Sequence, residues 1–178
     1  MRLLESDRVY LKKMSIQDDL NNYLDMVNDV KNVNMITGLG KVPLNIDDLI
    51  DFIKNYDGQL LGIFTKDNQH VGNIGFSNFN QISRSCSYGI IMSTKFKRQG
   101  YALAGSILAL NHVFQDLNLH RVYLDVMDSN APAIKLYEKL GFQRDGRMRD
   151  ACWTQGRYHD LYMYSLLKSE YKELAIER

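Results

Sequence analysis

The chain has 178 residues, of which 45% are hydrophobic and 24% are charged, and its formal net charge is +1. This length fits one domain, and we expect residues 1–168 to form it and residues 169–178 to be a polar tail. The near-neutral charge argues against a general nucleic-acid binder, which usually carries a basic excess. Two prolines and twelve glycines exclude a low-complexity or collagen-like chain.

The two cysteines, Cys86 and Cys152, do not have the spacing of metal ligands. Separate thiols favour a reducing compartment, and one disulfide is the alternative. The first residues show no apolar segment behind a basic one, and no stretch approaches the roughly 20 apolar residues of a membrane helix. We therefore expect a cytoplasmic protein with no metal and no contact with a membrane.

The first third of the chain predicts one strand and two helices. Residues 8–14 alternate as a strand, and Ser15 is placed to cap a helix over residues 17–28. Asn45 is placed to cap a second helix, with Asp48 three residues later as an acidic variant of the capping box. The apolar residues that follow Asn45 recur at helical spacing.

Strands dominate the rest of the chain, and two helices interrupt them. Strands that helices separate indicate some parallel pairing, and hairpins indicate antiparallel pairing. A mixed α/β (α+β) sheet with helices on both faces is therefore predicted. The predicted strands cover residues 60–66, 70–78, 84–92, 121–127, 142–153 and 157–167, and the predicted helices cover residues 101–115 and 131–140.

The segment 97–102 reads Lys-Arg-Gln-Gly-Tyr-Ala and lies between a predicted strand and a predicted helix. Gly100 allows the backbone to approach a ligand closely. The first N–H groups of a helix have no partner within it and carry partial positive charge, so a helix start suits a pyrophosphate. By itself the pattern also describes an ordinary helix start, and it is neither a P-loop nor a Rossmann fingerprint.

A second segment, residues 128–142, reads Asp-Ser-Asn-Ala-Pro-Ala-Ile-Lys-Leu-Tyr-Glu-Lys-Leu-Gly-Phe. Together with strand 84–92 and loop 97–102, it resembles the acetyl-CoA-binding core of the GCN5-related N-acetyltransferase (GNAT) family. The loop of that family reads Arg/Gln-x-x-Gly-x-Gly/Ala, and its second signature reads Asn-x-x-Ala-x-x-x-Tyr-Glu-Lys-Leu-Gly-Phe. The resemblance implies the GNAT fold, with a mixed, mostly antiparallel central sheet of about seven strands.

The resemblance also implies where acetyl-CoA binds. The backbone amides of the loop would hold the pyrophosphate, and the end of strand 84–92 would pair with the pantetheine arm like an added strand. Asn130 would bind the pantetheine, and it is also placed to cap helix 131–140, so one side chain can do both. The cofactor-binding residues that the family implies are Ile90, Ile91, Met92, Lys97, Arg98, Gln99, Gly100, Tyr101, Ala102 and Asn130.

Tyr137 matches the family position that protonates the departing CoA thiolate. A phenol can supply that proton or stabilise the thiolate by a hydrogen bond. The alternative is a core tyrosine on a short helix, with an apolar body and a polar tip. The family signature around Tyr137 favours catalysis.

The residue that accepts the proton of the amine stays unassigned. A primary amine with a pKa near ~10 is mostly protonated at neutral pH, so its proton must leave before attack. Many family members have a glutamate on strand 84–92, where this sequence has Ser87. Asp125 acting through water, His120 and His159 are the candidates, and a solvated channel would make a base unnecessary.

Two further features have simpler explanations than a role in catalysis. An acyl intermediate on Cys86 is disfavoured, because no histidine is spaced to activate the thiol. Asp47, Asp48 and Asp51 are placed to attract a polycation, but they also suit the start of a helix.

The region 144–167 resembles a branch of the family that includes ribosomal-protein N-terminal, polyamine and amino-sugar acetyltransferases. The residues that carry this resemblance are Gly146-Arg147 and Gly156-Arg157-Tyr158-His159-Asp160. We predict direct transfer of acetyl to the primary amine of a small molecule, a polyamine or an amino-sugar nucleotide, in one ternary complex. The alternatives are the N-terminal amine of a protein and, in another class, a non-catalytic acyl-CoA sensor. The family alone suggests a homodimer.

Overall fold

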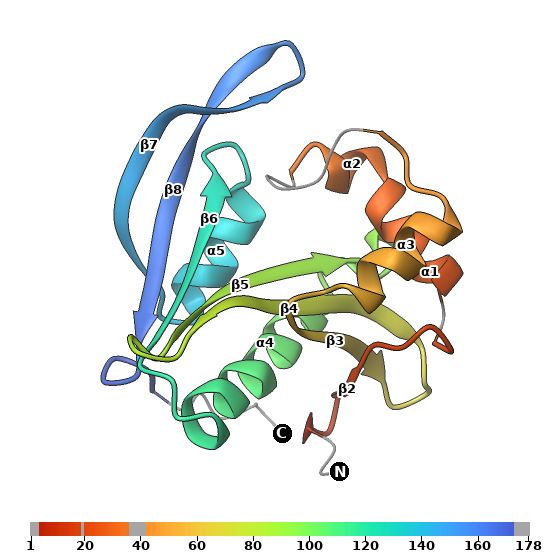
Figure 1. Cartoon of the computed structure of the whole chain (residues 1–178), viewed down its shortest axis with the longest axis horizontal. Helices are drawn as coiled ribbons and strands as arrows, with labels where there is room; N and C mark the ends of the chain where they lie inside the picture. Colours follow the sequence, from red (N-terminus) through yellow and green to blue (C-terminus); the bar gives the residue numbers. More distant parts are fainter. Residues whose placement is uncertain (1–3, 19, 36–41, 173–178) are drawn as a thin grey trace.

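The computed structural model describes residues 4–18, 20–35 and 42–172. Within them, eight strands form one sheet in the order β1-β2-β3-β4-β5-β6-β8-β7 (Figure 1). The elements are β1 Leu4–Glu5, β2 Val9–Lys13, α1 Leu20–Asn28, α2 Val30–Val33, α3 Ile46–Lys54, β3 Gly58–Thr65, β4 His70–Asn80, β5 Ser85–Met92, a 3₁₀ turn η1 Thr94–Phe96, α4 Tyr101–Asn111, a π-helical turn η2 His112–Asp116, β6 Arg121–Met127, α5 Ala131–Lys139, β7 Gln143–Thr154 and β8 Arg157–Leu167.

The strand pairing confirms the predicted mixed, mostly antiparallel sheet. Only β5 and β6 run parallel, and every other neighbouring pair is antiparallel. The prediction of about seven strands missed the two-residue β1, which pairs with β2. Two residues are too few to show an alternating pattern in the sequence.

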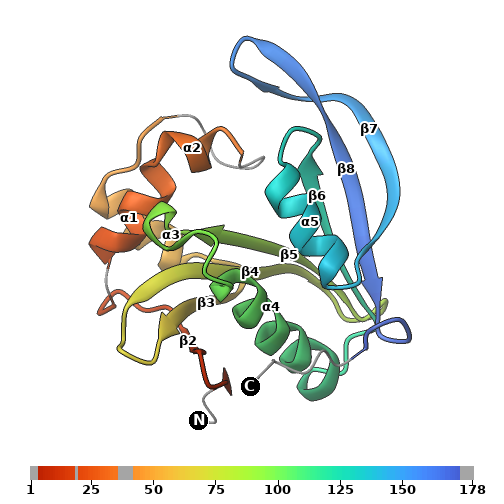
Figure 2. The same ribbon diagram turned by 180° about the vertical axis from the view of Figure 1, so that it is seen from behind.

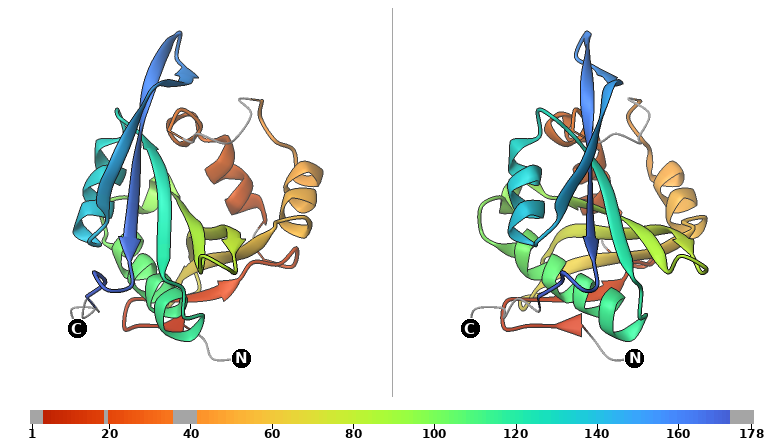
Figure 3. Two further views of the ribbon diagram at one scale, coloured as in Figure 1. Left: turned by 60° about the vertical axis from the view of Figure 1, so that its left-hand side comes forward. Right: turned by 90° about the vertical axis from the view of Figure 1, so that its left-hand side faces the viewer.

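Strand β3 shows why helices cover both faces of the sheet. Successive side chains of a strand point to opposite faces. Leu61 and Ile63 belong to a core that includes residues of α4, whereas Leu60 and Phe64 belong to a second core with residues of α1 and α3. Figures 2 and 3 show α4 and α5 on one face and α1 and α3 on the other.

Of the two helix caps predicted in the first third of the chain, one is confirmed and the other is wrong. Asn45 caps α3, because its Oδ1 accepts the N–H of Asp48 (3.0 Å) while the Asp48 carboxylate accepts the N–H of Asn45 (2.9 Å). Ser15 does not cap α1, which begins at Leu20. The Asp18 carboxylate accepts the N–H of Ser15 (2.7 Å), and this local turn replaces the first predicted helical residues.

The later boundaries follow the prediction closely. β6 and β8 have the predicted bounds, and Gly141 follows α5 with φ +93°, as expected of a residue after a helix end. The predicted helix 101–115 is divided, because α4 ends at Asn111 and a π-helical turn continues to Asp116.

The start of the predicted tail packs against the domain. The Tyr171 ring lies 4.9 Å from the ring of Phe114, centroid to centroid. Residues 173–178 lie outside the described residues, so the boundary at residue 168 stays a prediction. Among the described residues, the structure has no helix long and apolar enough to span a membrane.

Candidate functional site

A gap opens in the sheet between β5 and β6. The two strands pair only from Ser85↔Arg121 to Ser87↔Tyr123. Beyond these residues β5 continues along β4, and β6 continues along β8, so the two strands diverge (Figures 1 and 3). Among the described residues, no strand covers the β5 edge of residues 88–92 on the side of the gap.

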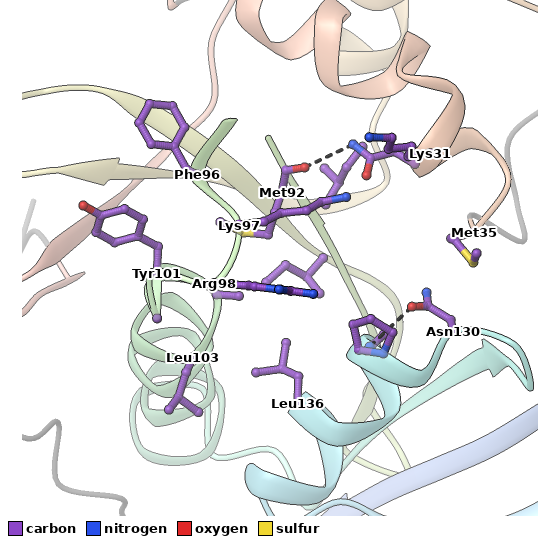
Figure 4. Close-up of a pocket in the computed structure, with 17 residues that line it drawn as sticks. Lys31, Met35, Met92, Phe96, Lys97, Arg98, Tyr101, Leu103, Asn130 and Leu136 are labelled. Atoms are coloured by element: carbon purple, nitrogen blue, oxygen red, sulfur yellow. Dashed lines mark hydrogen bonds between the residues drawn. The ribbon is translucent and has the colours of Figure 1, made fainter. Parts of the chain in front are cut away.

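A pocket of about 590 Å³ lies where β5 ends (Figure 4). Its walls come from β5, the loop after it, and the starts of α4 and α5, with α2 on the opposite side. Gln99 is the one predicted cofactor residue that does not line it. The predicted residues in the wall are Ile90, Ile91, Met92, Lys97, Arg98, Gly100, Tyr101, Ala102 and Asn130, and the wall residues that the sequence did not reveal are Lys31, Asn32, Met35, Phe96, Leu103, Pro132, Ala133 and Leu136.

The loop before α4 presents the start of that helix to the pocket. Gly100 precedes the helix with φ +80°, a left-handed conformation that glycine adopts readily. Its carbonyl accepts the N–H of Ala104 (3.0 Å), so the N–H groups of residues 101–103 have no partner within the helix. Arg98 is also left-handed, with φ +62°, at a cost of about 1–2 kcal/mol for a non-glycine residue. The loop is therefore held in a conformation that leaves backbone donors for a ligand.

Arg8, which directly precedes β2, holds this loop from outside the pocket. Its guanidinium donates to the backbone carbonyl of Gln99 (2.6 Å) and lies 5.7 Å from the ring centroid of Tyr101. A Cβ atom on Gly100 would come within 2.8 Å of Arg8 Nη1. Gln99 thus contributes to the loop through its tether to Arg8 rather than as part of the pocket wall.

The pocket wall has a cationic part and an apolar part. Lys97 and Arg98 extend into the pocket, and Lys31 lies opposite them on α2 (Figure 4). Positive side chains beside a helix start attract a phosphorylated group. Ile90 and Leu136 give the remaining wall an apolar character. These residues fit a molecule that carries a diphosphate and a long, mostly apolar arm.

Helix α2 ties one side of the pocket to β5. The buried side chain of Asn32 donates to the carbonyl of Met26 (3.0 Å) and to the carbonyl of Met92 (3.1 Å). Asp29 caps α2 by accepting the N–H of Lys31 (2.8 Å). A four-residue helix leaves no periodic pattern in a sequence, so the capping aspartate was the one signal that could have revealed it.

Asn130 caps α5, as predicted, and it also lies in the pocket wall. Its Oδ1 accepts the N–H of Ala133 (3.3 Å) and caps α5, and the same residue lines the pocket (Figure 4). Its backbone N–H donates to the carbonyl of Met127 (2.9 Å), which closes the turn between β6 and α5.

Tyr137 lies next to the pocket-wall residue Leu136 but is itself buried, with 6% of its surface exposed. Its ring contacts the rings of Tyr88 (6.1 Å between centroids) and Phe142 (5.9 Å). Burial, and then the charge of Asp125, raise the pKa of Tyr137 above its ordinary value of about 10. The phenol therefore keeps its proton at neutral pH. The ring contacts fit a core tyrosine, and the retained proton fits a general acid.

Ser87 is the residue that the sequence resemblance aligned with the glutamate of many family members. Its hydroxyl is 3.1 Å from the carbonyl of Ser77, 2.8 Å from the Ser77 hydroxyl and 3.2 Å from the Asn78 side-chain nitrogen. A serine hydroxyl held in this way has no proton-accepting strength comparable to a carboxylate. The structure thus offers no base on β5 at this position.

The structure argues against the roles that the sequence suggested for two other residues, Cys86 and His120. Burial raises the pKa of Cys86 to about 12, so this thiol stays protonated, which argues against an acyl-cysteine. His120 directly precedes β6, at the end of the gap where β5 and β6 still pair. Its backbone N–H donates to the carbonyl of Arg84 (2.6 Å). The described part of the chain contains no group of three or more histidine, cysteine or acidic side chains that could hold a metal ion.

His159 and Asp125 differ in how their side chains are engaged. The His159 ring is buried, and both of its nitrogens have partners, Asp128 (3.1 Å) and Arg157 (3.1 Å). Asp125 is exposed on β6 beyond the last β5–β6 pair, and its charge acts on Tyr137. Asp125 is therefore the candidate base that lies at the gap.

The comparisons with known proteins agree on one family. Residues 8–143 match the family described as an acetyltransferase (GNAT) domain. An uncharacterized N-acetyltransferase, p20 of Bacillus licheniformis, is 30% identical over 176 residues, which cover 96% of this chain and 99% of that protein.

Two further relatives differ in the acceptor that their names state. The spermidine N(1)-acetyltransferase of Vibrio cholerae is 34% identical over 101 residues, 57% of this chain and 58% of that protein. The putative ribosomal N-acetyltransferase YdaF of Bacillus subtilis is 30% identical over 117 residues, 66% of this chain and 58% of that protein. Each of these two matches therefore spans a little over half of the relative.

A solved structure shares the fold over most of the chain. The spermidine N-acetyltransferase of Vibrio cholerae in complex with CoA and spermine superposes with a TM-score of 0.85 at 24% identity, covering 93% of this chain and 99% of that chain. At this identity the similarity supports the fold rather than the substrate.

Gly100→Val is expected to weaken CoA binding by about 100-fold, or about 2.8 kcal/mol. A branched side chain is strained at φ +80° and would displace Arg8, which holds the loop. Isothermal calorimetry with CoA measures the change. Gly156→Val is the matched control, because Gly156 is also left-handed (φ +76°) but lies in the β7–β8 turn with open space around it. Equal CoA affinity in the two variants would contradict the assignment of the loop.

Proposed function

This chain belongs to the GNAT family of acetyl-CoA-dependent N-acetyltransferases, and on that premise we propose that its acceptor is the primary amine of a small molecule, a polyamine or an amino-sugar nucleotide. A polyamine is the better supported of the two, because relatives named spermidine N(1)-acetyltransferase match more than half of the chain. The amine attacks the thioester directly in one ternary complex.

The charge of the helical segment between β2 and β3 is the observation that carries this proposal. The cofactor pocket is lined by Lys31, Lys97 and Arg98. The chain from residue 20 to residue 57, which contains α1, α2 and α3, carries six aspartates and three lysines. A field of that sign raises the local concentration of a polycation and disfavours an anionic acceptor. The aspartates are Asp25, Asp29, Asp47, Asp48, Asp51 and Asp57.

The residues around the pocket suit the binding of acetyl-CoA, which supplies a thioester that is activated for attack. The N–H groups of residues 101–103, with Lys97 and Arg98, would hold the diphosphate. The uncovered edge of β5 from Ile90 to Met92 would form strand-type hydrogen bonds to the amides of the pantetheine arm. Asn130 would bind the same arm near its thiol end.

Two groups would move the protons in this reaction. Asp125, reached through water, takes a proton from the ammonium group of the acceptor and leaves a neutral amine. As the new N–C bond forms and the C–S bond breaks, Tyr137 gives its proton to the sulfur, and the nitrogen releases its second proton to solvent to become a neutral amide. Solvent then restores the proton of Tyr137 and removes the one held by Asp125.

A protein N-terminal amine is the second candidate acceptor. It is favoured by the similarity to the putative ribosomal N-acetyltransferase YdaF, whose alignment covers 66% of this chain. An α-amine with a pKa near ~8 needs less help to lose its proton than a polyamine. The enzymatic activity of the family sets aside the non-catalytic sensor.

Tyr137→Phe is expected to lower kcat by about 100-fold, because the phenol then supplies no proton to the sulfur. CoA affinity should change less than about threefold, since the ring keeps its contacts with Tyr88 and Phe142. Steady-state kinetics and calorimetry measure the two quantities. Tyr123→Phe, on the strand beside the gap, is the control. Similar losses of turnover and of CoA binding would make Tyr137 a structural residue.

Asp125→Asn is expected to lower kcat/KM by about 100-fold near neutral pH, because an amide accepts no proton. The deficit should shrink as the pH rises toward the amine pKa of ~10, where the acceptor loses its proton unaided. A pH profile of kcat/KM measures this, and Asp67→Asn, in the β3–β4 turn, controls for the loss of one negative charge. A deficit that is constant across pH would exclude proton transfer to Asp125.

The acceptor class is tested by turnover of acetyl-CoA with a matched panel of amines. Spermidine and spermine should react with a kcat/KM at least about tenfold above that of an amino-sugar nucleotide or of a peptide with a free N-terminus. CoA release, read with a thiol reagent, gives the rates. A peptide that reacts faster than either polyamine would favour the second candidate and overturn the first.

A further inference from the structure

The β7–β8 hairpin extends beyond the end of β6. The pairing of β6 with β8 ends at Met127↔Leu161, and the segment of the hairpin between Met148 and Leu161 projects past it (Figures 1 and 3). The strand register shifts between Met148 and Cys152, and Asp150 there has φ +49°. The hairpin is therefore irregular where it leaves the support of the sheet.

A cluster of polar residues fixes the hairpin at this point. The His159 ring lies 3.1 Å from Asp128 Oδ1, and Arg157 Nε donates to His159 Nε2 (3.1 Å). Asp160 forms an ion pair with Arg147. The backbone N–H of Asp128 donates to the carbonyl of Asp160 (3.0 Å). These residues include most of the segment Arg157-Tyr158-His159-Asp160, to which the reaction itself gives no role.

The partners of His159 determine where its proton lies. An arginine Nε always carries hydrogen, so Nε2 of His159 must accept. In the neutral ring the proton is then on Nδ1, which donates to the Asp128 carboxylate. Arg157 on the hairpin thus donates to His159, and His159 donates to Asp128, which follows β6.

Two members of the cluster, His159 and Asp160, are buried although the hairpin is mostly exposed. His159 is 6% exposed and Asp160 is 8% exposed, whereas most residues of β7 are exposed. The Asp150 N–H and then Arg147 hold the pKa of Asp160 below its ordinary value. Buried polar groups are costly to leave unpaired, so this set has one favourable arrangement, and the hairpin is fixed by it.

The cluster reaches the cofactor pocket through a turn of four residues. Asp128 is two residues before Asn130, which lines the pocket and caps α5. The turn is closed by the bond from the Asn130 N–H to the carbonyl of Met127 (2.9 Å). The orientation of Asp128 therefore affects the position of Asn130.

We propose that His159 is a positioning residue for acetyl-CoA: its hydrogen bond to Asp128 sets the turn that places Asn130 in the pocket. The inference rests on the part of the proposed function that places CoA beside Asn130. It is independent of the acceptor, so a wrong acceptor class would leave it standing.

Two isosteric variants separate this role from general packing. In His159→Gln the side-chain amide reaches the position of Nε2 and loses the donor to Asp128, whereas His159→Asn keeps a donor near the position of Nδ1. We expect His159→Gln to raise the Kd of CoA about tenfold and His159→Asn to raise it less than about threefold. Calorimetry with CoA gives both values, and thermal melting of each variant measures stability separately.

A double-mutant cycle tests whether His159 acts through Asn130. Asn130→Ala should raise the Kd of CoA about tenfold in the parent chain but less than about threefold in the His159→Gln background. Asp128→Asn gives the same cycle from the other side of the hydrogen bond if His159→Gln does not fold. His112→Gln is the matched control, because His112 also contacts a carboxylate, that of Asp116 (2.8 Å), on the π-helical turn after α4.

The proposal is overturned by any of three results. The first is an unchanged Kd in His159→Gln, and the second is equal weakening by His159→Gln and His159→Asn. The third is an effect of Asn130→Ala that is absent in the parent chain or is equally large in both backgrounds. CoA binding is the readout, so failure of the amine panel cannot be mistaken for any of these.

Discussion

The site exists because β5 and β6 pair along only three residues and then diverge. Beyond that point β5 stays with β4, and β6 stays with β8. Backbone groups on the edge of β5 toward the gap then lack a strand partner. Buried N–H and C=O groups require partners, and an extended amide-bearing arm can supply them. The start of α4 and the turn before α5 lie at the same opening, so the helix dipole, the cations and Asn130 converge there.

The sequence predicted those parts of the site that depend on local pattern or on a family motif. Gly100 and Asn130 sit where the two motifs placed them, and the capping box of α3 was readable from Asn45 and Asp48 alone. Residues that reach the pocket from distant segments were missed. Lys31 and Asn32 belong to a four-residue helix that packs on the end of β5 only in the folded chain.

The environment of individual side chains was the second limit of prediction. From the sequence, Asp125, His120 and His159 all remain candidates for the base. The fold separates them, because the His159 ring is held by Asp128 and Arg157, whereas Asp125 is exposed beyond the last β5–β6 pair. Likewise, burial raises the pKa of Tyr137 above that of an ordinary phenol, and no spacing of residues reveals burial.

The contact of Arg8 with the carbonyl of Gln99 joins residues that are 91 positions apart in the chain. Closing so long a segment is entropically costly, so the loop of residues 97–100 gains this support only after β2 has joined the sheet. Any ligand that binds only the supported loop also favours the docked state of that strand, in proportion to its concentration over its Kd. Bound coenzyme would thus stabilise the docking of β2 at the amino-terminal edge of the sheet. This edge lies at the opposite side of the sheet from the projecting hairpin.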